Sequence, residues 1–98
     1  MSKHEIILKP RAIQDIDRLR RYDAKRIVDA IEKHLTSDPT RQSRSSIKRL
    51  RGIRRPDYRL RVGEFRVFYA VDESGSQVSI LRVMHKDETQ AYYEELQR

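Results

Sequence analysis

Apolar and polar positions alternate along residues 58–62, which is the spacing of a β-strand. Successive side chains of a strand point to opposite faces, so Arg59 and Arg61 are predicted to face one way and their apolar neighbours the other. A turn and a returning strand, residues 64–71, complete a predicted β-hairpin. The hairpin therefore presents an apolar face to a core and a row of guanidinium groups to the outside. Arg66 joins that row if the pairing register allows.

The first part of the chain has the spacing of helices. Residues 3–9 form a short predicted strand, and Pro10 suits the first turn of a helix. Two predicted helices follow, separated near residues 21–22, and their apolar stripes comprise Ile13, Ile16 and Leu19 on the first and Ile27, Val28, Ile31 and Leu35 on the second. Asp23 is the predicted N-cap of the second helix, which is expected to end near residues 36–39 because a proline there disfavours further helix.

The rest of the chain adds strands and one helix. Residues 47–50 fit either a short strand or an approach to the next turn, and residues 78–83 form a further predicted strand. Asp87 is expected to cap a last helix, residues 88–98. The predicted order is β-α-α-β-β-β-α in a single domain, residues 1–98. This is an α+β fold with the two N-terminal helices packed on a curved, mostly antiparallel sheet.

Composition narrows the class of protein. A chain of 98 residues supports one modest core, and its periodic apolar segments indicate a folded protein despite 38% charged residues. No apolar run approaches the ~20 residues that span a bilayer, and the first ten residues lack the apolar stretch of a signal peptide. The absence of cysteine excludes disulfides and thiolate metal sites and fits a cytoplasmic protein.

The net charge of +7 is concentrated in one quarter of the chain. Residues 41–66 carry ten lysines or arginines and two acids, or +8, whereas the remaining residues carry twelve bases and thirteen acids, or −1. A focused basic field attracts polyanions and speeds encounter with them. We therefore expect a nucleic acid or an acidic protein as partner, with a solvated basic surface as the simpler alternative.

Several kinds of catalytic site do not fit this sequence. The three glycines all lie at predicted turns, and the three histidines lie far apart with no acids at metal-ligand spacing, so we expect neither a cofactor nor a metal. The carboxylates are scattered over the predicted helices and are expected to be solvated.

A cluster of cations with nearby proton carriers remains. RNA is cleaved without a metal when its own 2′-hydroxyl attacks the adjacent phosphate. That reaction needs cations around the transition state, a base for the hydroxyl and an acid for the leaving oxygen. Arginine meets the first need but not the others, because its pKa exceeds ~12. An RNA-binding hairpin without catalysis would carry the same cations.

Three stretches resemble the RelE/ParE superfamily of toxins from bacterial type II toxin–antitoxin pairs: residues 48–52, the run YRLRVGEFRVFY at 58–69, and residues 78–86. The similarity covers nearly the whole chain. It implies a toxin whose concave sheet face cuts mRNA in the ribosomal A site, and a cognate antitoxin that wraps it in a hetero-oligomer. Two alternatives stay open. ParE-type members inhibit DNA gyrase and generally lack the full nuclease set, and a decayed site would leave only an antitoxin-binding module.

The resemblance also implies site residues. RelE-type nucleases carry two basic residues on the first hairpin strand, an arginine after an aromatic on the return strand, and a basic residue six positions before a tyrosine. These positions are occupied here by Arg59, Arg61, Arg66, Lys86 and Tyr92. Lysine is typical of RelE at the hairpin pair, so Arg59 and Arg61 are expected to clamp phosphate rather than move protons. His85 titrates near neutral pH and is a credible acid or base.

We therefore predict a catalytic set and an RNA-binding set: Arg61, Arg66, His85, Lys86 and Tyr92 in the first, and Lys48, Arg49, Arg51, Arg54, Arg55 and Arg59 in the second. Each has a structural alternative. The hairpin arginines also fit the polar face of a half-exposed strand, and His85 also fits a hydrogen-bonded residue at a strand end. Tyr92 also fits a residue that packs beside Leu96, and the neighbouring Tyr93 is then the competing candidate for the catalytic tyrosine.

Overall fold

The computed structural model describes residues 3–43, 46–72, 74 and 76–98. Its elements are, in chain order, β1 (Glu5–Leu8), α1 (Pro10–Asp17), α2 (Arg21–Leu35), β2 (Ile47–Arg49), β3 (Tyr58–Val62), β4 (Phe65–Asp72), β5 (Gln77–His85), the 3-10 turn η1 (Lys86–Glu88) and α3 (Thr89–Leu96). None of the described helices is long and apolar enough to cross a membrane.

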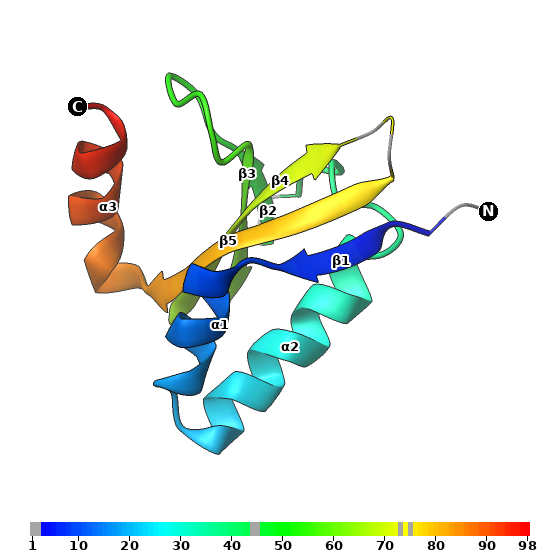
Figure 1. Cartoon of the computed structure of the whole chain (residues 1–98), viewed down its shortest axis with the longest axis horizontal. Coiled ribbons are helices and arrows are strands. Elements are labelled where there is room, and N and C mark those ends of the chain that lie inside the picture. The colour runs from blue at the N-terminus through cyan, green and yellow to red at the C-terminus, as the bar shows by residue number, and fades with distance from the viewer. Residues whose placement is uncertain (1–2, 44–45, 73, 75) are drawn as a thin grey trace.

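The five strands form one mixed sheet in the order β1-β5-β4-β3-β2. β1 runs parallel to β5, and the other neighbours are antiparallel. Figure 1 shows α1 and α2 on one side of the sheet and α3 beside the carboxyl end of β5. The predicted α+β class, with two N-terminal helices on a mostly antiparallel sheet, is confirmed. Residues 47–49 are a strand, which adds one β to the predicted order.

Each face of the sheet has its own apolar cluster. The larger cluster joins α1 and α2 to inward-facing residues of the strands, among them Leu60, Val67 and Tyr69, which are all fully buried. The smaller cluster lies on the other face, where Phe68 and Met84 pack against Tyr92 of α3. The alternation along β3 and β4 explains this division, because residues next to each other on a strand face opposite ways.

The helices follow the predicted repeat with local exceptions. Ile27, Ile31 and Leu35 recur four apart on α2 and are buried. Ile13 and Val28 were expected in the apolar stripes but are 44% and 41% exposed. On α1 the buried positions are Ala12 and Asp15, and Ile16 is partly buried against the core, as is Leu19 just beyond the end of the helix.

Two predicted helix caps are wrong. α2 begins at Arg21 with Arg20 in extended backbone before it, so Asp23 lies inside the first turn, where its charge suits the helix dipole. Before α3, His85 caps η1 in place of Asp87: its Nδ1 accepts a hydrogen bond from the Asp87 amide at 3.1 Å. The Glu88 carboxylate in turn accepts from the His85 amide, also at 3.1 Å.

Asp15 was expected to be solvated, but it joins α1 to the edge of the sheet. β1 pairs with β5 only as far as Ile80, and beyond this point no strand among the described residues pairs with β5 on that side. The Asp15 carboxylate accepts a hydrogen bond from the Val83 amide at 2.9 Å and two from the Arg82 guanidinium group, at 2.8 and 3.2 Å. A buried carboxylate with three donors thus replaces strand pairing along this stretch of the edge.

Candidate functional site

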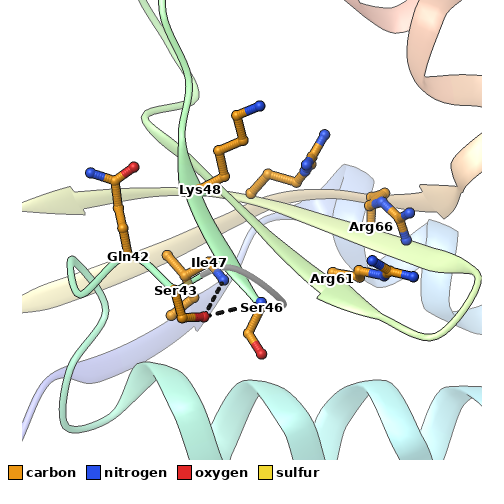
Figure 2. A pocket seen from close by; sticks show the side chains of 8 residues that line it. Gln42, Ser43, Ser46, Ile47, Lys48, Arg61 and Arg66 are labelled. Atoms are coloured by element: carbon orange, nitrogen blue, oxygen red, sulfur yellow. Dashed lines mark hydrogen bonds between the residues drawn. The ribbon is translucent and has the colours of Figure 1, made fainter.

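One face of the sheet carries the hairpin arginines. Arg61 pairs with Arg66 across β3 and β4, and Lys48 pairs with Arg59 across β2 and β3. In Figure 2 Arg61 and Arg66 extend from neighbouring strands in the same direction. We call this side of the sheet, which also bears Phe68 and α3, the arginine face. The expectation that Arg66 joins the row of Arg59 and Arg61 is confirmed by the register.

A pocket of about 470 Å³ opens on the arginine face. We call it the arginine pocket, and its lining residues are Gln42, Ser43, Ser46, Ile47, Lys48, Arg59, Arg61 and Arg66. Among these described residues none is a histidine or a carboxylic acid. The pocket is therefore a site of concentrated positive charge with hydroxyl and amide groups along one wall (Figure 2).

The guanidinium group of Arg66 is held by backbone at the hairpin turn. Its Nη1 donates to the carbonyl oxygens of Gly63 at 3.0 Å and Phe65 at 2.9 Å. Partial burial lowers the pKa of Arg66 from its usual value, and the positive charges of Arg59 and Arg61 lower it further. Repulsion of this kind is relieved when an anion binds, so the cluster is suited to a phosphate.

The opposite wall of the pocket is tied down by side-chain bonds to backbone. The Ser43 hydroxyl accepts the amides of Ser46 at 3.1 Å and Ile47 at 3.3 Å, as the dashed lines in Figure 2 show. The Gln42 side-chain oxygen accepts the Arg49 amide at 3.1 Å. These contacts tie Gln42 and Ser43 to Ser46 and to β2, so the pocket has a defined second wall.

A second hollow of about 560 Å³ lies between α3 and the segment around β2. We call it the α3 groove; its lining residues are Gln42, Lys48, Arg49, Leu50, Arg51, Ile53, Arg59, Gln90, Tyr93 and Gln97. It shares Gln42, Lys48 and Arg59 with the arginine pocket, so the two hollows adjoin. The combined surface mixes cations, amides and one aromatic ring.

The two tyrosines of α3 take different sides of Phe68. The Tyr92 ring lies 4.9 Å from the Phe68 ring and beneath the Arg82 guanidinium, and burial raises the pKa of Tyr92. The Tyr93 ring meets Phe68 edge-on at 5.7 Å, and its hydroxyl accepts a hydrogen bond from Arg59 at 3.4 Å. The phenol that reaches the hairpin arginines is therefore that of Tyr93, while Tyr92 packs.

Lys86 and His85 both lie near Glu64 at the hairpin turn, and His85 also lies near Asp87 of η1. Lys86 Nζ lies 3.2 Å from Glu64, and His85 lies 3.7 Å from Glu64 and 3.4 Å from Asp87. The hydrogen bond and charge of Lys86 lower the pKa of the Glu64 carboxyl. His85 pairs with Phe65, one position away from Arg66, so it faces the side of the sheet that α1 and α2 cover. The structure does not bring His85 into the arginine pocket.

The remaining predicted RNA-binding residues are spread over three places. Lys48 and Arg59 line the arginine pocket, and Arg51 lines the α3 groove. Arg54 and Arg55 are exposed in the loop between β2 and β3 and line neither hollow. Arg49 also borders the α3 groove, but its guanidinium turns to the other face of the sheet, where it donates to the Tyr58 hydroxyl at 3.2 Å.

A family model described as "ParE toxin of type II toxin-antitoxin system, parDE" matches residues 6–90. The chain belongs to this family of the RelE/ParE superfamily. It is thus a toxin of a type II toxin–antitoxin system, as the sequence motifs indicated. No curated protein sequence matches the toxin.

Solved structures support the same fold. The toxin is similar to a chain of the RelBE2 toxin–antitoxin complex from Mycobacterium tuberculosis, with 25% identity, 85% of the toxin and 98% of that chain covered, and a TM-score of 0.74. The toxin is 20% identical to a chain of the RelE–RelB complex from Pyrococcus horikoshii. The match covers 85% of the toxin and 94% of that chain, with a TM-score of 0.69. The toxin is 19% identical to a mutant RelE from E. coli in the free state. That match covers 94% of the toxin and 93% of the other chain, with a TM-score of 0.70.

Sequence reasoning missed the neutral residues that line the site of the toxin. Gln42, Ser43 and Ser46 form the second wall of the arginine pocket, and Gln90 and Gln97 line the α3 groove. Charge counting does not find amides and hydroxyls. The only sequence signal was their position, since the first three precede the basic hairpin and the last two lie one helical turn on either side of Tyr93.

Proposed function

We propose that the toxin is a ribosome-dependent endoribonuclease that cuts mRNA in the ribosomal A site without a metal. The observation that carries the proposal is the convergence of Arg59, Arg61 and Arg66 on one pocket whose described lining has no carboxylate. Directly opposed like charges destabilise a sheet, so such a cluster is expected where an anionic ligand compensates it. A phosphodiester matches the charge and the planar donors of arginine.

The arginines would act on charge rather than on protons. The 2′-oxygen attacks phosphorus and the bond to the 5′-oxygen breaks, which leaves a 2′,3′-cyclic phosphate and a 5′-hydroxyl end. Arg61 and Arg66 stabilise the negative charge that grows on the phosphoryl oxygens, and Arg59 with Lys48 holds a flanking phosphate. We assign proton transfer at the pocket to the Tyr93 phenol, because its hydroxyl is hydrogen-bonded to Arg59.

Lys86 takes a positioning role in this proposal. Its ammonium group neutralises Glu64, whose carboxylate otherwise lies close enough to Arg66 to offset part of the positive charge. His85 supports the same turn through Glu64 and caps η1, which leads into α3. Arg51, Arg54 and Arg55 extend the basic surface along the loop between β2 and β3, where the RNA backbone would track.

The proposed partners are mRNA on the ribosome and a cognate antitoxin. The neighbouring structures from M. tuberculosis and P. horikoshii are toxin–antitoxin complexes. An antitoxin for this chain would carry an acidic segment that covers the arginine face, since opposite charge gives fast association. Occupation of the arginine pocket by carboxylates would exclude the RNA phosphates and so inhibit the toxin.

A gyrase inhibitor without catalysis is the second candidate function. Two observations favour it. The matching family model is that of ParE toxins. In addition, neither His85 nor any described carboxylic acid lines the arginine pocket, so a strong acid–base pair is not at hand there. On this alternative the arginine face is a docking surface for an acidic protein.

Mapping of RNA 5′ ends after a short induction separates the two functions. Wild-type toxin is expected to give new 5′-hydroxyl ends within translated mRNA, and Arg66→Ala to abolish them while circular dichroism shows a folded protein. Arg41→Gln, which removes one exposed charge outside the arginine pocket, is the matched control and should cut normally. Inhibition of supercoiling by purified gyrase, with translation and mRNA intact, would establish the second candidate instead.

A further inference from the structure

We propose that the toxin forms a homodimer in which β1 of one copy pairs antiparallel with β1 of a second copy. β1 is the outermost strand on one side of the sheet (Figure 1), and among the described residues no strand pairs with its outer edge. An edge strand presents unpaired backbone groups, to which another chain can add a strand. The proposal does not depend on the proposed nuclease, because the arginine pocket lies beside β2, at the opposite edge of the sheet.

Elsewhere along the edges of the sheet, outward-facing amides are capped by side chains of the same chain. Four amides of β2 and β5 have such an acceptor: Ser43 for Ile47, Gln42 for Arg49, Asp15 for Val83 and Glu88 for His85. Caps of this kind occupy the groups that a further strand would use, so they keep an edge from pairing with another chain. The outer edge of β1 differs from these stretches.

The outward-facing backbone groups of β1 belong to Ile6 and Leu8. The amides of Glu5 and Lys9 both donate to carbonyl oxygens on the β5 side, at 2.8 and 3.0 Å. Alternate residues of a strand direct their amide and carbonyl groups to the same side, so those of Ile6 and Leu8 point away from β5. Within the described part of the chain, neither of these two amides has an acceptor. The edge is therefore open at two consecutive pairing positions.

These two residues define the register of the proposed dimer. Both can pair in both copies only when Ile7 lies on the two-fold axis, with Ile6 opposite Leu8 of the second copy and Leu8 opposite Ile6. The same register places Glu5 opposite Lys9 of the second copy on each side of the axis, and both side chains are exposed. Opposite charges at facing positions attract, so β1 is complementary in charge to a second copy of itself.

The surroundings of β1 also suit a second copy. A groove of about 340 Å³ lies between β1 and α2, and its lining includes Ile6, Leu8 and Val28. Leu8 and Val28 are 37% and 41% exposed. Directly opposed residues of an antiparallel pair share a face, so Leu8 of the second copy lies beside Ile6 at this groove and removes apolar surface from water.

The distribution of charge allows two copies of a basic protein to meet at this edge. Residues 41–66 carry a net charge of +8, and the remaining residues carry −1. The basic residues therefore lie on and around β2 and β3, on the far side of β4 and β5 from β1. Repulsion between the two basic regions is weak at such a separation, because salt screens charges beyond about 10 Å.

Reversal of the two charges in β1 tests the register. Glu5→Lys and Lys9→Glu each place like charges opposite each other at both ends of the paired strands. Each variant alone should raise the dissociation constant of the dimer about tenfold or more in sedimentation of the purified toxin. An equimolar mixture of the two variants should dimerise again, because every facing pair in the mixed dimer joins opposite charges.

Arg41→Glu is the matched control, since it changes the net charge as Lys9→Glu does but lies outside β1, and it should dimerise like the wild type. Amide hydrogen exchange gives a second readout. The Ile6 and Leu8 amides should exchange more slowly as the concentration of wild-type toxin rises, and they should stay fast in Lys9→Glu. The Glu5 amide, which is bonded on the β5 side, should be protected in both proteins.

Three results would overturn the proposal. The wild-type toxin would be a monomer at every concentration, or its dimer would survive each charge reversal, or the mixture of the two variants would fail to dimerise while circular dichroism shows that both are folded. Protection of the Ile6 and Leu8 amides in a monomeric toxin, seen only after addition of an antitoxin, would assign the edge of β1 to the antitoxin instead.

Discussion

Arg61 and Arg66 face each other directly across the β3–β4 hairpin. Arg66 is held by the carbonyls of Gly63 and Phe65, whereas the Arg61 side chain has no hydrogen bond or ion pair within the described part of the chain. The exposed Arg61 therefore adds repulsion to the hairpin without a compensating contact. A charge placed at such a position reduces stability and is best explained by the ligand that it binds.

Replacement of Arg61 by glutamine should uncouple stability from toxicity. Because an opposed like-charge pair is removed, we expect the free energy of unfolding of Arg61→Gln to stay level or rise by about 0.2–1 kcal/mol in urea denaturation. Growth arrest on induction should be lost, since one phosphate ligand is gone. Arg41→Gln controls for net charge and should remain toxic. A destabilised or fully toxic Arg61→Gln would contradict the assignment.

The two tyrosines of α3 should respond differently to loss of the hydroxyl. Tyr93→Phe removes the phenol bonded to Arg59 and is expected to slow single-turnover cleavage of ribosome-bound mRNA by about 10²–10⁴-fold, the usual weight of a proton-transfer group. Tyr92→Phe keeps the ring against Phe68 and should retain activity. The reverse pattern would return the catalytic role to Tyr92.

The hairpin was predictable because one local rule decides it. A strand has a period of two, so the faces of Arg59 and Arg61 followed from the sequence without knowledge of the rest of the fold. The place of Arg66 stayed conditional on the register, which the structure sets with a tight turn at Gly63, whose φ is +57°. The sequence thus placed Arg59 and Arg61 on one face, but Lys86, His85 and Tyr92, which were predicted in the same site, do not line the arginine pocket.

Helix rotation and distant partners were not predictable in this way. Neighbouring residues on a helix point about 100° apart, so the choice between Tyr92 and Tyr93 depends on how α3 sits on Phe68. Ile13 was misplaced because α1 docks through Ala12 and the carboxylate of Asp15. The Asp15–Arg82 contact joins residues that are 67 positions apart, and nothing local in the sequence marks it.

Asp15 should be the most sensitive carboxylate of the fold. Asp15→Ala leaves the Arg82 guanidinium and the Val83 amide without their buried acceptor, so we expect a loss of about 3–5 kcal/mol in the free energy of unfolding. Asp29→Ala breaks the exposed pair with Lys25 and should change stability by at most about 0.5 kcal/mol. Equal effects of the two substitutions in urea denaturation would show that Asp15 does not anchor α1.

The Glu64 carboxyl should titrate below its ordinary pKa of 4.5, chiefly because Lys86 donates a hydrogen bond to it. A lowered pKa in the folded state means that the interaction is complete above pH 4.5 and is lost as the pH falls through the lowered value. Carbon-detected titration should therefore show a midpoint below 4.5 that rises toward 4.5 in Lys86→Gln. Lys25→Gln, which breaks only the pair with Asp29, should leave the Glu64 midpoint where it is.

A double-mutant cycle on Glu64 and Lys86 decides whether Lys86 acts on RNA directly. If Lys86 only neutralises Glu64, Lys86→Gln exposes a carboxylate close to Arg66 and weakens RNA binding, and adding Glu64→Gln restores it because that carboxylate is gone. If Lys86 binds a phosphate itself, the double variant stays as weak as Lys86→Gln alone. Affinity for an uncleavable RNA at two salt concentrations measures both cases, since loss of a phosphate contact also lowers the salt dependence of binding. We expect restoration, with the salt dependence of the wild type.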